Sequence, residues 1–594
     1  MSRKIIEIGQ RKLLSIFIFS ISSCHCWAFT NNMAIEANGD MNNDSALVNQ
    51  PNVINPILGD SNTGSTVNAA DIVELANYIM GLPSDIYNEV NADVNEDGIV
   101  NIADIVKLVN IYMGTSLLSF SLSDGTTVWN SFGVKNDTIM VQVPNNFNLK
   151  MTTASFTYKG SCVSLNGEMQ LSGEGIHDFS DFCNPPEYIV KGFDGNERKY
   201  TIEIFNLPII YMNTPDSVEI NSRNEWLGNC SITIRDTDGT IEDYGEANVK
   251  GRGNWTWRQG LADGKKPYVI KLVNKPKDKT VLGMPGHKRW VLLSNPVSFL
   301  PNPVGFEVNR RAETCKWAPR SRFVELFLNG KHRGLYLLCE QIRIDKNRVS
   351  IKKMNETDIE DDAVTGGYLI SYDDAIEDND PMYNSHYFNM PFMIKNPDTD
   401  NIQPAQFEYI SNYINEAEFS LYDDERFSNG DFYNFFDVDS WIDYYFVEEL
   451  WGGLEMKRPR SVWLYKDRGG GKLSAGPAWD MESNFFDKQE FYCNTALYYG
   501  RLFQSNEVVG RMKTKWNQFR SNLVGNEKYG SIINFIDTLY DECHLAADRD
   551  RKMTPASFYG HLPYEESKID YEYQVIRDNI LVKLDWLENQ IMLW

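Results

Sequence analysis

The chain has 594 residues, enough for several domains, and its 42% hydrophobic and 13% aromatic residues suffice for packed cores. Its formal net charge of −25 disfavours a general nucleic-acid binder, because phosphate backbones require clustered cations. Nine cysteines without a CxxC pair and seven histidines without HExxH disfavour a zinc site, and the nucleophile motif GxSxG is missing.

The N-terminus has the pattern of an export signal. A positive region with Arg3, Lys4 and Lys12 precedes a short apolar run from residue 13 to 21, which is too short to span a bilayer. The following ISSC sequence favours a lipoprotein signal (residues 1–24) with Cys24 as the lipidated residue; cleavage near Ala28 is the alternative. We therefore expect a protein outside the cytoplasm, touching the membrane only through a lipid anchor.

Residues 25–55 are rich in Asn, Asp, Ser and Ala and predict a linker. An internal repeat follows, in which two loops precede the related strings NAADIVELANYIMG and NIADIVKLVNIYMG. Calcium takes six to eight oxygens, which a tight loop supplies from alternate positions. The candidate metal ligands are Asp60, Asn62, Asn68 and Asp71 in the first loop and Asp93, Asn95, Asp97, Asn101 and Asp104 in the second.

This duplicated pattern over residues 56–116 resembles a dockerin domain, which implies a small helical module, calcium ions and a cohesin module of a scaffold protein as partner. The first copy departs from the pattern, because Gly64 and Ser65 replace a carboxylate and the turn glycine. We expect its calcium site to be the weaker one. The alternative is a pair of Asn/Asp-rich turns that only cap helices.

Residues 117–207 carry short alternating runs separated by turn signals, such as SFSLSD, TIMVQVP and KYTIEIF. This pattern predicts a small antiparallel β-sandwich of immunoglobulin-like type, with the role of a spacer. Cys162 and Cys183 could bridge its strands, because export permits disulfides.

The remaining residues, 208–594, are β-rich up to Tyr372 and helical around residues 439–451 and 508–594, with one further strand pair at 383–396. A basic island lies in the β-rich part, since residues 250–353 hold 23 Lys or Arg against 7 Asp or Glu. Such an island suits an anionic ligand such as a nucleoside triphosphate, although solvated basic faces give the same count.

Six motifs follow one another in this region: KGRGNWTW, KKPYVIKL, VLGMPGHKRWVLL, RSRFVELFLNGKHRGLYLLCEQI, GGYLI and YKDRGGGKLSAGPAWD. In this order and spacing they resemble the spore-coat protein H (CotH) kinase family. The resemblance implies an α+β, two-lobed atypical protein-kinase-like fold. It also implies ATP, a divalent ion (Mg²⁺ or Mn²⁺) and transfer of phosphate to Ser or Thr of a surface protein.

Phosphoryl transfer requires a cation on the phosphates, usually held by a carboxylate. The resemblance assigns the phosphates to Lys271 in PYVIKL, with Lys266 as the alternative, and leaves Glu340 and Glu307 open as the partner of that lysine. Arg252 and Asn254 belong to a Gly-rich turn that could cover the phosphates. Ordinary surface ion pairs are the alternative for both glutamates.

By the same resemblance, Asp480 in GPAWD binds the metal, and Glu482 stands where the family has a second Asp. In DVDSWIDYYFVEELWGGLE the positions Asp437, Ser440, Tyr445 and Glu449 match the family. Glu455 replaces the catalytic Asp, a change of about 1 Å in reach, and Gly453 replaces an Asn. Pro301 stands where an Arg is expected.

These departures favour, as the alternative function, a non-catalytic (pseudokinase) surface protein docked on a scaffold. A glycan-processing enzyme component is a third possibility, because Asp373 and Asp374 form a carboxylate pair. The sequence therefore predicts an exported modular protein with a calcium-dependent docking module, a β-sandwich and a kinase-like domain whose catalytic residues are Lys271, Glu455 and Asp480.

Overall fold

The computed structural model describes residues 58–594, apart from residues 63, 65–66, 83–85, 193–194, 264, 277–278, 296–297, 374–379, 399, 458, 482–488 and 555–568. The predicted signal and linker, Ser65, Asp374 and Glu482 lie outside the described residues. The chain divides into two compact units. The first holds residues up to 141 with 150–178 and 185–203, and the second holds 142–149, 179–184 and 204–594.

The repeat forms a helical module in which α2 (Ala69–Ile79) packs against α4 (Ile102–Met113), with the short α3 (Glu89–Ala92) between them in sequence. Asn68 and Asn101 begin the two long helices in the same way, each with a capping box closed by the aspartate three residues later. The apolar positions repeat at helical spacing, and they form one buried cluster: Ile72, Leu75, Ala76, Ala92, Val94, Ile105 and Leu108.

The second module is β-structure, as predicted, but it is one continuous eight-stranded sheet in the order β4-β1-β2-β3-β8-β7-β5-β6. The rings of Phe120 in β1 and Tyr188 in β7 lie 5.2 Å apart, so strands far apart in this order face each other. The immunoglobulin-like type remains a prediction. The strands are β1 (Ser116–Ser123), β2 (Val128–Lys135), β3 (Thr138–Gln142), β4 (Thr153–Lys159), β5 (Cys162–Leu165), β6 (Glu168–Gln170), β7 (Glu187–Lys191) and β8 (Glu197–Phe205).

The β-rich part of the second unit is a closed barrel in the order β10-β11-β12-β15-β17-β16-β9. Helix α6 (Pro301–Arg310) packs on its outer face, where Val269, Val291 and Leu337 share one core with Val304 and Val308. The barrel strands are β9 (Ile209–Asn213), β10 (Leu227–Arg235), β11 (Ile241–Gly251), β12 (Tyr268–Leu272), β15 (Arg289–Leu293), β16 (Ser321–Leu328) and β17 (Lys331–Glu340). The smaller elements here are η2 (Pro215–Ser217), α5 (Trp255–Asp263), β13 (Thr280–Val281) and β14 (Met284–Pro285).

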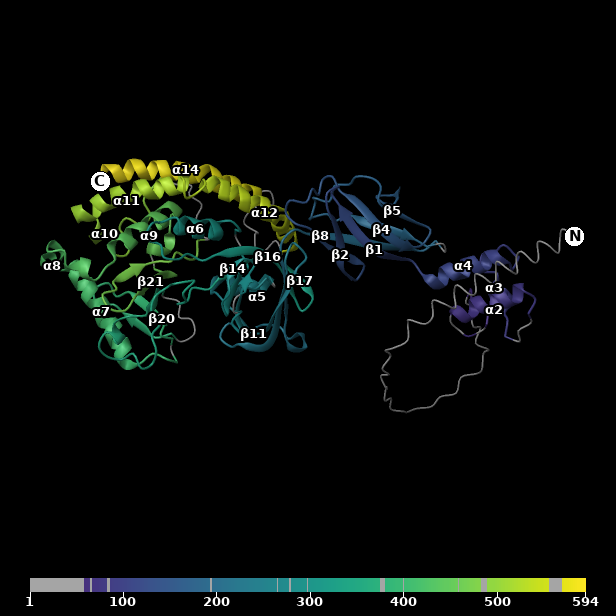
Figure 1. Ribbon diagram of the computed structural model, residues 1–594, viewed down its shortest axis with the longest axis horizontal. Coiled ribbons are helices and arrows are strands. Elements are labelled where there is room, and N and C mark those ends of the chain that lie inside the picture. Colours follow the sequence, from purple (N-terminus) through teal and green to yellow (C-terminus); the bar gives the residue numbers. More distant parts are fainter. Residues whose placement is uncertain are drawn as a thin grey trace, which may run out of the picture. The chain divides into compact units, whose positions relative to one another are not determined.

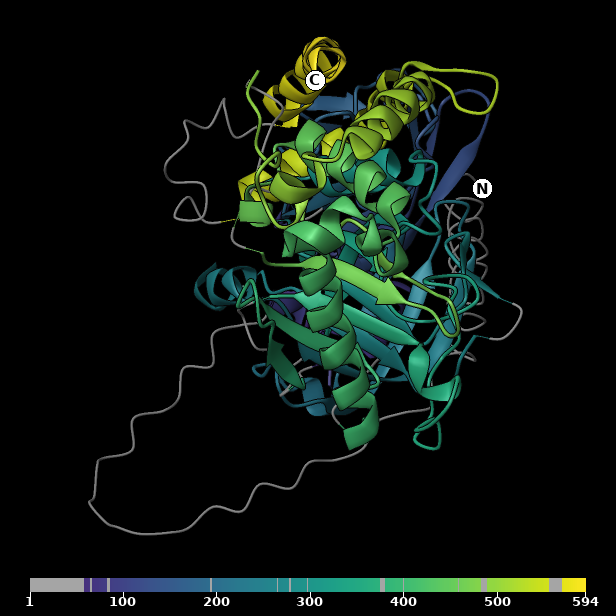
Figure 2. The same cartoon turned by 90° about the vertical axis from the view of Figure 1, so that its left-hand side faces the viewer.

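A five-stranded sheet in the order β19-β20-β18-β21-β22 opens the second half of this unit. Figure 2 shows α7 running along this sheet, where Ile410 and Ile414 share a core with Ile370 and Phe392. The predicted strand pair at 383–396 is confirmed as β19 (Met382–Asn384) and β20 (Pro391–Asn396). The other strands are β18 (Tyr368–Tyr372), β21 (Val462–Lys466) and β22 (Leu473–Ala475).

The helices gather after this sheet, and Figure 1 shows α11, α12 and α14 running along one side of the unit. The predicted order of a β-rich part followed by a helical part is confirmed. The helices are α7 (Pro404–Tyr422), α8 (Asp424–Ser428), α9 (Val438–Trp451), α10 (Tyr499–Leu502), α11 (Asn506–Val524), α12 (Ile532–Met553) and α14 (Ile569–Leu593). Three 3₁₀ turns accompany them: η3 (Ala363–Thr365), η4 (Asp431–Asn434) and η5 (Leu454–Lys457).

The seven described cysteines are all free thiols, so the predicted bridge between Cys162 and Cys183 is wrong. Cys162 and Cys183 also belong to different compact units. Within the described ranges, none of the helices combines the length and the apolar character that crossing a lipid bilayer requires.

Candidate functional site

In two loops of the first unit, backbone amides donate hydrogen bonds to aspartate side chains of the same loop. In the second loop, Asp93 accepts the N–H groups of Asp97 and Gly98 at 3.2 and 2.8 Å. In both loops the last aspartate binds two amides: Asp71 accepts from Asn62 and Asn68, and Asp104 from Asn95 and Asn101. The carboxylates therefore converge on each loop from both of its ends, which suits a hard cation that prefers oxygen ligands.

Asn68 and Asn101, predicted as calcium ligands, use their side-chain oxygens to cap α2 and α4, at 2.8 Å from the amides of Ala70 and Ala103. An asparagine at this position therefore starts the helix that follows the loop. The amide of Gly64 donates to Asp60 at 2.8 Å. The residue at the equivalent position of the second loop is Asp97, which supplies an additional carboxylate. The first loop thus lacks one acidic ligand.

A pocket in the second unit brings together the two carboxylates predicted to perform the chemistry. Glu455 on η5 and Asp480, which lies beyond the end of β22, line it together with Glu448 of α9. Glu448 is only 5% exposed, and its pKa is raised to about 8 by burial and then by repulsion from Glu455 and Asp480. Three acids from separate elements therefore face one small space, which also contains Arg460.

Two residues of this pocket have left-handed backbone conformations, with φ of 64° at Asp480 and 53° at Ser461. The Ser461 hydroxyl donates to the Asp480 carboxylate at 3.3 Å, and the Ser461 amide donates to Asp373 at 3.2 Å. Such a backbone costs on the order of 1 kcal/mol or more for residues other than glycine, and it gathers at functional sites. The strain indicates that the surrounding structure fixes the direction of the Asp480 side chain.

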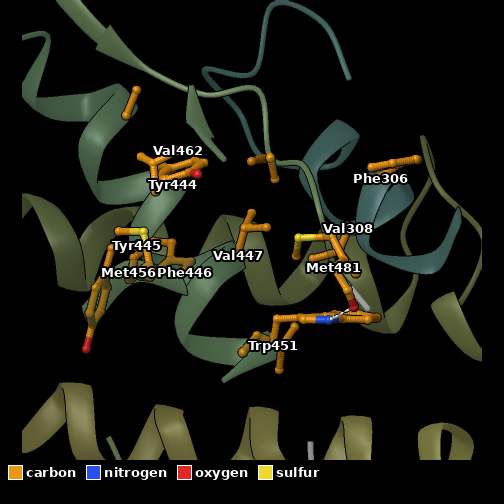
Figure 3. Close-up of a cluster of buried hydrophobic side chains, with 14 of the residues drawn as sticks. Phe306, Val308, Tyr444, Tyr445, Phe446, Val447, Trp451, Met456, Val462 and Met481 are labelled. Atoms are coloured by element: carbon orange, nitrogen blue, oxygen red, sulfur yellow. Dashed lines mark hydrogen bonds between the residues drawn. The ribbon is translucent and has the colours of Figure 1, made fainter. Parts of the chain in front are cut away.

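Helix α6 holds the Asp480 turn from both sides. The side-chain oxygen of Asn309 accepts the amide of Ala478 at 3.1 Å, and that of Asn302 accepts the amide of Met481 at 3.0 Å. Figure 3 shows Met481 close to Val308 of α6 and to Trp451 of α9, whose indole donates to the Met481 carbonyl at 2.5 Å. The position of Asp480 therefore depends on α6 and α9 together.

A group of cations lies on the outer face of the barrel. Lys271 of β12 is exposed and stands directly opposite Arg289 of β15. The indole of Trp226 has the charged groups of Lys250, Lys271 and Arg289 at 5.0, 5.9 and 4.8 Å from its centroid. Like charges facing each other across a strand pair destabilise a sheet, so this cluster is suited to an anionic ligand.

The pKa of Lys271 is lowered, first by partial burial and then by the neighbouring cations Arg289, Lys288 and Arg343. Arg252 follows Lys250 by two residues at the end of β11, and its guanidinium lies 5.7 Å from the ring of Trp479. Trp479 precedes Asp480 and stacks on Phe306 of α6 at 5.4 Å. Arg252 therefore connects the barrel to the turn that carries Asp480.

Two models of known protein families match parts of the chain. The family model described as "CotH kinase protein" matches residues 249–587, more than half of the chain. The chain belongs to the CotH kinase family. The family model described as "Dockerin type I domain" matches residues 58–111, so the calcium-loop module is a dockerin, which implies calcium binding. No curated protein matches the chain.

Lys266 and Asn254, two further residues predicted for the phosphates of the CotH kinase domain, differ in their surroundings. Lys266 is 8% exposed, and its ammonium donates to the Ile220 carbonyl at 3.1 Å and to Asn221 at 2.7 Å. Asn254 is exposed, and its carbonyl accepts the amide of Arg258 at 3.3 Å in the first turn of α5. The Lys266 ammonium is thus already engaged, which leaves Lys271 as the better candidate for the phosphate-binding lysine, and the side chain of Asn254 stays a prediction.

The two carboxylates predicted to hold Lys271 pair with arginines instead. Glu340 is fully buried and takes a bidentate contact from Arg320 at 2.9 and 3.0 Å. Glu307 pairs with Arg310 and, at 2.9 Å, with Arg311 on its own helix. In the structure, neither glutamate therefore pairs with Lys271: Glu307 forms an ion pair with Arg311, and Glu340 forms a buried one with Arg320 and not the expected surface pair. Among the described residues Lys271 forms no ion pair.

Sequence reasoning missed Glu448, because the family pattern drew attention to its neighbour Glu449. The structure separates the two: Glu449 accepts the amides of Tyr492 and Cys493 at 2.6 and 2.7 Å, whereas Glu448 faces the pocket. The available signal was a second acid next to Glu449 in α9, seven residues before Glu455. Glu482, the other acid predicted for the metal, lies outside the described residues.

The acid pocket fits magnesium in its donor chemistry. Magnesium is usually bound by one or two carboxylates together with water and substrate phosphates. Glu455 and Asp480 supply such carboxylates. In the part of the chain that the structure describes, no three His, Cys, Asp or Glu side chains already form a metal cage.

Replacing Glu448 by glutamine is expected to stabilise the CotH domain at alkaline pH and to leave it unchanged near pH 4. The raised pKa means that the folded state keeps a proton that the unfolded state loses above about pH 4.5. Wild-type stability should therefore fall between pH 4.5 and 8, by on the order of 3–5 kcal/mol, and the variant should lose less. Urea unfolding with chelator present measures this difference, and equal pH profiles would contradict it.

Replacing Asp93 by alanine is expected to weaken calcium binding more than replacing Asp60, because the second loop has the fuller set of acidic ligands. Calorimetric titration of the whole chain with calcium should show two sites for wild type. The Asp93→Ala variant should lose the tighter site, and Asp60→Ala the weaker one. Two equal sites, or heat that survives both changes, would refute this assignment.

Proposed function

We propose that this CotH-family protein transfers the γ-phosphoryl group of ATP to a Ser or Thr hydroxyl of a surface protein. Its dockerin module holds it on a scaffold outside the cytoplasm, since dockerin type I domains characteristically bind cohesin modules. The observation that carries the proposal is the acid pocket with Glu455 and Asp480, whose turn is linked through Trp479 and Arg252 to the cation face of the barrel.

In this proposal Lys271, Lys250 and Arg289 bind the phosphates, because three cations around one indole are stabilised by a polyanion. Asp480 holds the metal, with Glu482 as a second ligand by sequence. Glu455 accepts the proton of the acceptor hydroxyl. Magnesium or manganese held by Asp480 and Glu482 would offset the negative charge of the phosphates.

Two observations support the proposal that the protein is exported. Residues 1–24 have the pattern of an export signal, and the chain contains a dockerin module, a type of domain that occurs in extracellular proteins. Lipidation at Cys24 would keep the protein at the membrane surface, and cleavage near Ala28 would release it. Mass spectrometry of the mature N-terminus distinguishes the two, since a lipidated cysteine begins the chain in one case only.

The test of the enzymatic proposal combines binding with transfer. ATP with magnesium should raise the unfolding temperature of the full chain, and labelled γ-phosphate should appear on Ser or Thr of the chain or of an added surface protein. ADP should stabilise without labelling. An unfolding temperature that ATP leaves unchanged with either Mg²⁺ or Mn²⁺ would overturn the proposal.

A non-catalytic CotH-like domain is favoured by particular observations. Glu455 has a longer reach than aspartate, Gly453 offers no side chain to a metal, and Lys271 has no carboxylate partner among the described residues. This alternative predicts stabilisation by ATP without labelled product. Restoring the family residues in Gly453→Asn with Glu455→Asp should then create transfer activity.

A further inference from the structure

A groove separate from the acid pocket lies between α6, the strands β16 and β17, and α12. Its cavity volume is about 220 Å³, which gives room for side chains of a ligand but lies below the range of sites that enclose a whole drug-sized molecule. The two sites share no lining residue. On α6 they use different side chains, since Asn302 and Asn309 hold the Asp480 turn while Pro303 and Arg310 line the groove.

Apolar side chains from every wall of the groove line part of its surface. Pro303 of α6, Phe323 of β16 and Leu337 of β17 line it together with Phe535 and Leu539 of α12. Phe323 and Leu337 are buried, whereas Phe535 and Leu539 are half-buried, so the α12 side remains within reach of a ligand. Such a surface accepts an aromatic or branched aliphatic side chain.

Three arginines line the same groove: Arg310, Arg320 and Arg322. The side chains of Arg310 and Arg320 are each 35% exposed, while their carboxylate partners Glu307 and Glu340 are 12% and 0% exposed. The acids therefore lie behind the guanidinium groups, and the surface offered to a ligand is positive.

Arg322 adds to this positive surface, because it is exposed and its guanidinium binds the carbonyl of Ser321 at 2.9 Å. Glu542 is an acid that lines the groove: burial raises its pKa, and the charge of nearby Arg322 lowers it in part, so Glu542 offsets some of the positive charge of the groove. Guanidinium groups bind carboxylates in a planar, bidentate manner and keep their charge at every physiological pH. An anionic group next to an apolar one therefore complements the groove.

We propose that this groove docks a peptide segment of a partner protein in which acidic side chains flank an aromatic or branched aliphatic one. The apolar side chain enters between α12 and the barrel strands, and the acidic side chains meet Arg322 and the exposed edges of Arg310 and Arg320. The site selects a partner at a distance from the acid pocket, and it acts whether or not the CotH domain transfers phosphate.

The test uses the full chain without nucleotide and a fluorescein-labelled peptide of sequence Glu-Asp-Phe-Glu-Leu-Glu, followed by fluorescence anisotropy. Replacing the four acids by lysine, or Phe and Leu by serine, should each weaken binding by about tenfold or more, because charge and apolar contact are both required. Equal binding of the three peptides would overturn the proposal.

Two protein variants locate the binding in the groove. Arg322→Glu should weaken binding of the acidic peptide by about tenfold and strengthen binding of the lysine peptide. Leu539→Asp should abolish binding of both peptides. The matched control is Lys331→Glu, at the exposed start of β17, which should bind as wild type does. If Leu539→Asp does not fold, Arg322→Glu still tests the site, because Arg322 is exposed and its replacement should leave the fold intact. An unchanged affinity of Arg322→Glu for the acidic peptide would refute the site.

Discussion

Replacing Asp480 by asparagine is expected to reduce phosphate transfer by at least about a hundredfold and to remove the magnesium-dependent part of the stabilisation by ATP. Asparagine keeps the size of the side chain and an acceptor for the Ser461 hydroxyl, and it tolerates the left-handed backbone at φ 64°. The variant therefore removes one negative charge from the acid pocket with little change in the fold. Labelled-phosphate transfer and thermal unfolding measure the two effects.

The matched control is Asp578→Asn, an exposed acid on α14, which should transfer phosphate and respond to magnesium as wild type does. Asp480→Asn should unfold at the wild-type temperature when metal and nucleotide are absent. Transfer that persists within about threefold in a folded Asp480→Asn variant would show that the metal is bound elsewhere or is not needed.

Replacing Asp550 by asparagine is expected to destabilise the CotH domain by about 3–5 kcal/mol, because it leaves a buried lysine without its counter-charge. Asp550 of α12 is 1% exposed and contacts the ammonium of Lys265 at 2.5 Å. Its other oxygen accepts the amide of Leu335 in β17 at 2.9 Å, a bond that asparagine can keep. Urea unfolding followed by tryptophan fluorescence measures the loss.

A double variant separates the buried charge from other effects. Lys265→Met with Asp550→Asn removes both charges, keeps the acceptor for the Leu335 amide and should recover most of the lost free energy, whereas Asp550→Asn alone should not. Asp541→Asn, an exposed change on the same helix, serves as the control. If Asp550→Asn costs less than about 1 kcal/mol, the pair contributes little and α12 is anchored to the barrel by its apolar contacts.

Much of the modular plan was predictable from short-range patterns. The repeat at 60–104, the position of α9 and the strand pair β19–β20 follow from spacing and periodicity, which act over a few residues. The acids Glu455 and Asp480 were identified by motifs, and the structure places both in one pocket. Sequence patterns also predicted a β-structure for residues 117–207, but not the single sheet into which the strands pair.

By itself, the sequence determined which residue types are available: two calcium loops, a basic island and a small set of acids in recognisable motifs. The tertiary structure decided which of them meet. Glu340 pairs with Arg320 and not with Lys271, because the end of β17, which carries Glu340, lies beside Arg320 in the segment before β16. Glu448 lies in the pocket because packing buries almost every residue of α9. Such partners are fixed by packing between segments far apart in the chain, and no local pattern records them.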